Sequence, residues 1–370
     1  MTESPKQIRW GRPPWTIDFH PGGHSIPQEV DFAVIGGGFT GLAAAAWLRH
    51  LDPRRSVALF EAESIGSGAS GRSGGMTLAE TAAGDLPGLG DVLSGFSNVL
   101  THLGVDCDLS LPGAWELGRK GAQLNSAIQW ADSGKLRIAD EVPGGSADPG
   151  KLLTGLARAA DRAGALIFQN SRVDSVVFDN PLRLNFCGQQ IRAGNVLLAT
   201  NALSLELSAM VNHVEPKFTL AIATAPLSSE QIETIGLASR RSFYTVDLPY
   251  LWGRLLRTNA VIFGSGLVHL RHWKDVDDLN IAAGMPAEII TSLEQRVRKL
   301  HPALGSVEFT HRWGGPILFA SDWRPIFRRH PKSPRVIVLG AYSGHGVALS
   351  VHLGSWAAEA MLGTRELPEW

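Results

Sequence analysis

Three glycines at a fixed spacing are the residues whose chemistry is easiest to interpret. Gly36, Gly38 and Gly41 form a Gly-x-Gly-x-x-Gly pattern, and Glu61 follows twenty residues after the last of them. Such glycines let the backbone turn tightly, approach a pyrophosphate and pack a helix against a strand. An acidic residue about 20 positions further on can accept hydrogen bonds from a ribose diol. The spacing predicts a bound dinucleotide, with a glycine-rich turn of some other α/β protein as the alternative.

The flanking segments supply the elements that this chemistry requires. Residues 32–35 form an apolar run that suits a buried parallel strand, residues 42–48 are strongly helix-forming, and residues 56–61 read as a second strand. The helix would direct its N-terminal N–H groups at the phosphates. We therefore predict cofactor contacts from Gly36, Gly38, Phe39, Thr40, Gly41, Glu61 and Ala62.

A second glycine-rich segment, residues 66–75, follows the first closely. Its many backbone N–H groups suit close passage along a phosphate and a planar ring, although a flexible surface loop would have a similar composition. The predicted contacts are Ala69, Ser70, Gly71, Arg72, Ser73, Gly74 and Gly75.

A third segment repeats the order of strand, glycine turn and helix. A buried strand at 336–340 leads into Gly344-His345-Gly346 and a helix over about 347–362. A helix N-terminus beside a reduced flavin would stabilise negative charge that develops on the ring, and His345 can add to that field or only complete an ordinary turn. The predicted contacts are Ser343, Gly344, His345, Gly346 and Val347.

In this order, the three segments resemble the FAD-dependent oxidoreductases of the D-amino-acid oxidase superfamily. Gly68–Arg72 and Tyr342–Gly346 most resemble the gamma-glutamylputrescine oxidase group within it. The resemblance implies FAD, with hydride transfer from an amine-bearing carbon to flavin N5 and hydrolysis of the resulting imine. It implies either O2, giving H2O2, or another electron acceptor. It also implies cofactor contacts from Val173, Ala199, Thr200 and Gly315.

Departures from the family pattern refine this expectation. Some members of the family attach the flavin covalently through a His or a Cys. Here the second glycine-rich segment has no His, and residues 319–323 have no Cys, so FAD is expected to be non-covalent. Gly315 stands where amino-acid oxidases have an Arg for the substrate carboxylate, which favours an amine without a nearby carboxylate. Arg312, Arg254 or Arg257 can substitute from another angle. Sarcosine oxidases of the family place a Lys near the flavin that helps oxygen to react. The comparable residues 266–272 have no Lys, so the identity of the electron acceptor stays open.

The remaining candidates concern the substrate. His345, Tyr250 and Arg312 are the candidate catalytic residues, and Trp252 and Trp313 are candidate walls of an aromatic pocket for an amine. A glycine- or sarcosine-type amino-acid oxidase and a non-catalytic flavin-binding subunit remain as alternatives.

The composition limits which partners, metals and membrane contacts can be expected. The chain has 370 residues, 44% hydrophobic and 19% charged, with a formal net charge of −1, so nothing favours nucleic acid or an anionic membrane as a partner. Cys107 and Cys187 lack metal-ligand spacing, and no metal site is predicted. No apolar run approaches the roughly 20 residues of a membrane span. The cytoplasm is the expected location, and the oligomeric state is open.

The expected fold is α/β with two domains that share the chain discontinuously. We assign residues 30–84, 146–214 and 320–370 to a Rossmann-like FAD-binding domain. An antiparallel-sheet substrate domain takes 85–145 and 215–319, and residues 1–29 form an N-terminal arm. Residues 81–145 read as helical and loop-rich.

Overall fold

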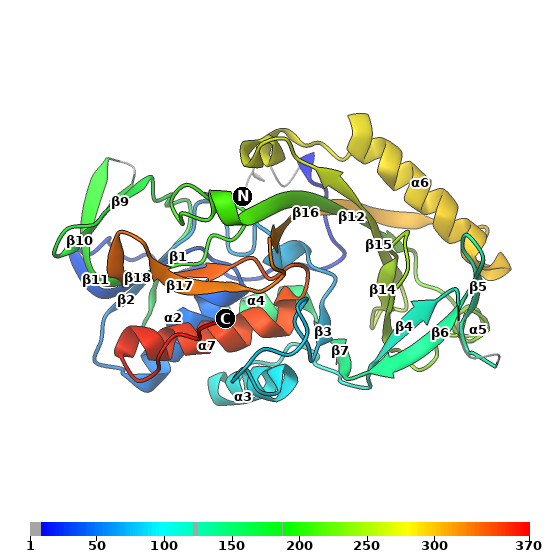
Figure 1. Cartoon of the computed structure of the whole chain (residues 1–370), viewed down its shortest axis with the longest axis horizontal. Coiled ribbons are helices and arrows are strands. Elements are labelled where there is room, and N and C mark those ends of the chain that lie inside the picture. Colours follow the sequence, from blue (N-terminus) through cyan, green and yellow to red (C-terminus); the bar gives the residue numbers. More distant parts are fainter. Residues whose placement is uncertain (1–8, 121–124, 187) are drawn as a thin grey trace.

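The computed structural model describes residues 9–120, 125–186 and 188–370. Two large sheets lie side by side (Figure 1). The first has the order β17-β18-β11-β1-β2-β8, and β10 and β9 continue from β11. Its central pairs are parallel, whereas β17, β10 and β9 are antiparallel to their neighbours. The strands are β1 (Glu29–Ile35), β2 (Val57–Phe60), β8 (Leu166–Phe168), β9 (Ser175–Val177), β10 (Leu182–Phe186), β11 (Gln189–Leu198), β17 (Ile326–His330) and β18 (Ser333–Gly340).

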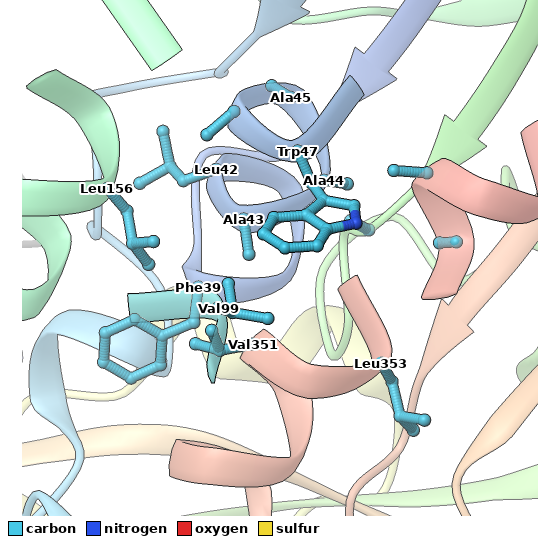
Figure 2. Close-up of a cluster of buried hydrophobic side chains, with 14 of the residues drawn as sticks. Phe39, Leu42, Ala43, Ala44, Ala45, Trp47, Val99, Leu156, Val351 and Leu353 are labelled. Carbon is cyan, nitrogen blue, oxygen red and sulfur yellow. The ribbon is translucent and has the colours of Figure 1, made fainter. Parts of the chain in front are cut away.

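A layer of helices covers one face of this sheet: α2 (Phe39–Leu51), α3 (Val92–Leu103), α4 (Pro149–Arg162) and α7 (Gly346–Leu362). Figure 2 shows α2 in the middle of this layer, with side chains of α3, α4 and α7 around it. Small residues allow the close packing: a Cβ on Gly354 of α7 would lie 2.8 Å from the Thr40 carbonyl oxygen and 3.1 Å from the Ala43 Cβ of α2. This contact holds the middle of α7 against the first turns of α2.

The second sheet has the order β16-β12-β15-β14-β13-β4-β6-β5 and is antiparallel except for the β13–β4 pair. Helices α5 (Ser229–Thr234) and α6 (Gly284–Leu300) pack on one of its faces. A small sheet of β3 (Met76–Leu78) and β7 (Gly144–Ser146) is also present. The strands of the second sheet are β4 (Ala114–Gly118), β5 (Gln129–Ala131), β6 (Lys135–Val142), β12 (Val214–Thr224), β13 (Ser242–Thr245), β14 (Trp252–Leu255), β15 (Val261–His269) and β16 (Phe309–Ala320).

The predicted fold class is confirmed, because a mostly parallel sheet with helices alternates along the chain with a mostly antiparallel one. Two details differ from expectation. Residues 81–145 were expected to be helical and loop-rich, yet they contain the strands β4, β5 and β6 and the start of β7. Helix α3 falls in the range predicted for the substrate domain but packs against α2 and α7. The domain boundaries themselves stay a prediction.

Two further observations concern the expected partners. Within the described ranges, no helix combines the length and the apolar character that crossing a membrane requires. The same residues contain no cluster of three or more potential metal ligands. Cys107 is a buried free thiol, whereas Cys187 lies outside the described residues.

Candidate nucleotide-binding and active site

The first glycine turn joins the end of β1 to the start of α2. Gly36 has a φ of +113°, and a Cβ there would lie 2.5 Å from the carbonyl oxygen of Ala199, at the end of β11. A Cβ on Gly41 would lie 1.9 Å from the Gly36 carbonyl oxygen. Both contacts are with backbone, which cannot give way as a flexible side chain can. These two positions therefore require glycine, and the turn lies against the carboxyl end of the neighbouring parallel strand.

Glu61 lies at the end of β2 and is buried. Its carboxylate accepts hydrogen bonds from the N–H of Gly37 (2.7 Å), the N–H of Glu63 (3.0 Å) and the hydroxyl of Ser67 (3.3 Å). Burial raises its pKa. An ionised carboxylate has about four acceptor positions, so about one remains for a ribose hydroxyl. Glu61 also joins the first turn to the second glycine segment, a role that spacing alone did not predict.

The second glycine segment lies directly over the N-terminus of α2. The Ser70 hydroxyl accepts a hydrogen bond from the Phe39 N–H at 3.0 Å, and the Gly66 N–H donates to the Gly37 carbonyl at 3.0 Å. A Cβ on Gly38 would approach the Ser70 hydroxyl to 2.8 Å. The first glycine turn and the second glycine segment, which are close in sequence, are therefore also in contact in the fold.

The third turn, between β18 and α7, has an unusual backbone. Ala341 and Ser343 have φ values of +58° and +50°, and such conformations cost about 1–3 kcal/mol each for residues other than glycine. Surrounding contacts hold them: the Asn201 Oδ1 accepts from the Ala341 N–H at 2.9 Å, and the Ser343 hydroxyl accepts from the Ala320 N–H at 3.1 Å. Backbone strain that the fold maintains in this way is common at binding sites.

Side chains link the first and third turns. The hydroxyls of Thr40 and Tyr342 are 2.7 Å apart and buried, which ties the first turn of α2 to the loop before α7. The N-cap residues of α2 and α7, Gly38 and His345, provide no side-chain cap, whereas the adjacent α3 and α4 are capped by Asp91 and Asp148. At α2, the Ser70 hydroxyl of the second glycine segment accepts from the Phe39 N–H instead. First-turn N–H groups have no intrahelical acceptor and carry partial positive charge. The N-terminus of α2 thus follows the carboxyl end of β1, that of α7 follows the loop after β18, and the Thr40–Tyr342 pair links the first turn of α2 to that loop.

These features fit a bound dinucleotide. The glycine positions leave no room for side chains, and the buried Thr200 hydroxyl beside Gly36 has no hydrogen-bond partner in the described part of the chain. Anionic ligands of open α/β sheets bind at this edge, beyond the carboxyl ends of the parallel strands. A phosphate there can take hydrogen bonds from the helix N–H groups and from the Thr200 and Ser70 hydroxyls.

The second sheet turns one face toward the second glycine segment. On β14, the Trp252 ring would meet a Cβ on Gly74 at 2.3 Å, and the Arg254 guanidinium donates to the Ala147 carbonyl at 3.1 Å. On β16, the Trp313 Nε1 donates to the Arg72 carbonyl at 3.0 Å. Trp252 and Trp313, the candidate pocket walls, thus lie on the face of the second sheet that is turned toward the second glycine segment, and their role in the pocket stays a prediction. Trp313 is fully buried in this structure.

One of the three candidate catalytic residues, Arg312, faces away from the second glycine segment. Arg312 is on the opposite face of β16, where its guanidinium pairs with Glu294 of α6 at 2.6 Å, because successive side chains of a strand alternate between faces. Tyr250 is 53% exposed. Its carbonyl accepts from Arg296 of α6 at 2.8 Å. The placement of Arg312 speaks against its predicted role, whereas the role of Tyr250, two residues before Trp252, stays a prediction.

His345 is the candidate that the structure does bring to the glycine turns. It is the residue before α7, and its Nδ1 is 3.4 Å from the Ser343 carbonyl. Burial lowers its pKa below the ordinary value of 6.5. His345 is therefore neutral near pH 7 and adds a hydrogen-bonding group to the helix terminus, not the positive field that the sequence analysis allowed.

The side chain of Arg72, a residue predicted as a cofactor contact, binds backbone carbonyls of the protein. Its Nη1 donates to the carbonyls of Trp10, Gly11 and Gly314, so the guanidinium serves the protein backbone. No spacing rule would have found this arrangement, since the three carbonyls come from distant segments. The remaining predicted contacts stay predictions: Ala62 is exposed, Val173 is buried, and Ala69, Ser73, Gly75, Gly315, Gly346 and Val347 lie in or beside the three turns.

Comparison with known proteins agrees with this geometry. The family model described as FAD dependent oxidoreductase matches residues 31–360. The chain belongs to this family. It is 26% identical to a probable oxidoreductase OrdL of Haemophilus influenzae, covering 92% of this chain and 84% of the relative. It is 25% identical to the gamma-glutamylputrescine oxidoreductase of Escherichia coli, covering 91% and 84%.

A solved structure shares the fold. The glycine oxidase of Geobacillus kaustophilus superposes with a TM-score of 0.71 at 20% identity, covering 92% of this chain and 96% of that one. The predicted superfamily is thereby confirmed, and the chain is an oxidoreductase of an FAD-dependent family.

Proposed function

We propose that this oxidoreductase oxidises the C–N bond of an amine that has no carboxylate next to the reacting carbon, using non-covalently bound FAD. The observation that carries the proposal is that the first two glycine turns contact each other, that the Thr40–Tyr342 pair joins the third turn to the first, and that the Trp252 ring of the second sheet lies against Gly74 of the second turn. The relatives named for gamma-glutamylputrescine and glycine support an amine-bearing substrate.

The positions of the arginines favour the carboxylate-free substrate. Arg312 faces α6, and the Arg254 guanidinium is held by the carbonyls of Gly74 and Ala147. Arg257 is exposed and pairs with Asp108 at 3.3 Å. Each of the three candidates for binding a carboxylate is thus otherwise engaged. An amino-acid oxidase would require one of them to be released.

The protein's share of the chemistry is binding, orientation and electrostatics. When bound, the flavin supplies the two-electron oxidant that takes a hydride from the amine-bearing carbon. Trp252 would provide an apolar wall that holds the carbon in place and excludes water, and the fully buried Trp313 would support this wall from the same cluster of side chains. The N-terminus of α7 would offer partial positive charge to a bound flavin as it takes up negative charge, and neutral His345 stands at that terminus. The product imine hydrolyses to a carbonyl compound.

Anaerobic titration of the purified holoprotein tests the proposal. We expect an amine from a panel of polyamines, acylated amines, N-methyl amino acids and free amino acids to bleach the flavin absorbance. Amines without an adjacent carboxylate should react best. A flavoprotein that no member of the panel bleaches would instead be a flavin-binding subunit, and preference for free amino acids would favour the amino-acid oxidase. Acid precipitation should release the flavin into the supernatant, and peroxide formed under air identifies O2 as an acceptor.

A further inference from the structure

The buried guanidinium of Arg72 lies inside a cage of backbone carbonyls. Arg72 is 7% exposed. Its Nη1 donates to the carbonyl oxygens of Gly11 at 2.8 Å and of Trp10 and Gly314 at 3.2 Å, and its Nε donates to Ser67 at 3.3 Å. Its Cζ lies 5.2 Å from the centre of the Trp10 ring. Two of these carbonyls belong to the N-terminal arm, so Arg72 connects the arm to the second glycine segment.

The arm is docked by further specific contacts. Trp10 is fully buried, and its carbonyl accepts from the Gly314 N–H at 2.8 Å. Gly11 has a φ of +70°, and a Cβ there would lie 2.1 Å from the Arg312 carbonyl of β16. The Trp15 Nε1 donates to the Gly71 carbonyl at 2.8 Å. The arm therefore bridges β16 and the glycine segment.

The glycine segment needs such external support. Five of its ten residues are glycine, and glycine loses more conformational freedom on folding than any other residue. Ser70, two residues before Arg72, contacts the N-terminus of α2. The position of Ser70 thus depends on contacts that fix the segment from the other side, and Arg72, Trp15 and the arm supply them.

We propose that residues 9–17 are a strap of the flavin site, with Arg72 as the positioning residue through which docking of this strap and binding of FAD stabilise each other. The inference rests on the proposed FAD site. It assigns Arg72 an indirect action, through the shape of the segment, and not a contact with a phosphate. Because such coupling is reciprocal, a change that releases the strap must weaken FAD binding, and FAD must hold the strap in place.

The test uses full-length variants with a matched control. Gly11→Val forces a side chain against the β16 backbone and leaves Arg72 intact. Gly23→Val changes another glycine of the arm, one with no neighbour within 4 Å of an added Cβ. Arg72→Gln removes the caged charge. FAD affinity is measured by flavin fluorescence on apo-protein. Release of the strap is measured as chymotryptic cleavage after Trp10, a site that is fully buried while the strap is docked.

We expect Gly11→Val and Arg72→Gln each to weaken FAD binding at least tenfold. Their combination should be little worse than either alone, because both act on the same strap. Gly23→Val should bind FAD as the natural chain does, and FAD should slow cleavage after Trp10 in the natural chain at least tenfold. Normal FAD affinity in Gly11→Val, or cleavage that ignores FAD, would overturn the inference. If Arg72→Gln does not fold, Gly11→Val and the cleavage assay still decide. A natural chain that never takes up FAD counts against the proposed function instead.

Discussion

The hydroxyl pair of Thr40 and Tyr342 gives the sharpest test of how the two helix N-termini are held. Tyr342→Phe removes one partner of a buried 2.7 Å hydrogen bond and leaves the Thr40 hydroxyl unsatisfied. An unsatisfied buried hydroxyl costs about 1–3 kcal/mol, whereas replacing both partners by apolar groups of similar shape is nearly neutral. Tyr342→Phe should therefore lower the free energy of unfolding by about 1–3 kcal/mol, and the double variant with Thr40→Val should recover most of that loss.

FAD affinity should behave differently from stability in the same variants. Both the single and the double variant lack the link between α2 and the loop before α7, so both should bind FAD more weakly than the natural chain. Urea denaturation of the apo-proteins measures stability, and flavin fluorescence measures affinity. If the double variant recovers affinity together with stability, the bond has only a structural role. If Tyr342→Phe is as stable as the natural chain, the reasoning about the buried pair is wrong.

Three further outcomes are expected. Gly41→Ala should destabilise the fold by about 1–3 kcal/mol and abolish FAD uptake, because its Cβ would press on the Gly36 carbonyl at 1.9 Å; normal flavin content would contradict this. Arg312→Met should retain FAD and turnover within about twofold and lose about 0.2–1 kcal/mol of stability, as for an exposed ion pair; a large loss of turnover would return Arg312 to the active site. His345→Gln should reduce the loss of stability between pH 7 and 5, because burial depresses the folded-state pKa of His345, so protonation opposes folding as the pH falls through the unfolded value of about 6.5. An unchanged pH profile of the urea midpoint would show that His345 does not carry this penalty.

The parts of the fold that local sequence dictates were predictable. Gly36 and Gly41 are needed where the backbone passes within a few ångströms of another carbonyl, and that requirement is visible in the spacing of the glycines. The apolar runs before them, and the helix-forming residues after them, identified β1, α2, β18 and α7 within a few residues. Strands β4 to β7 were missed because most are short and the segment is broken by glycine and proline.

The features that the sequence did not predict are contacts between distant residues and the face of a strand on which a side chain lies. A shift of one residue along a strand moves a side chain to the other face, and this separates Arg312 from Trp313. The cage around Arg72 joins carbonyls of the arm and of β16, which lie about sixty and more than two hundred residues away in the chain. The link between Thr40 and Tyr342 is equally remote. No local pattern reports such contacts.

The central claim is that the three glycine turns together bind one FAD. Titration of apo-protein with FAD, followed by flavin fluorescence and absorbance, tests this most directly. We predict saturable uptake of one FAD per chain, with release on denaturation and no uptake by Gly41→Ala. A folded natural chain that is purified without flavin absorbance and takes up no added FAD would contradict the account.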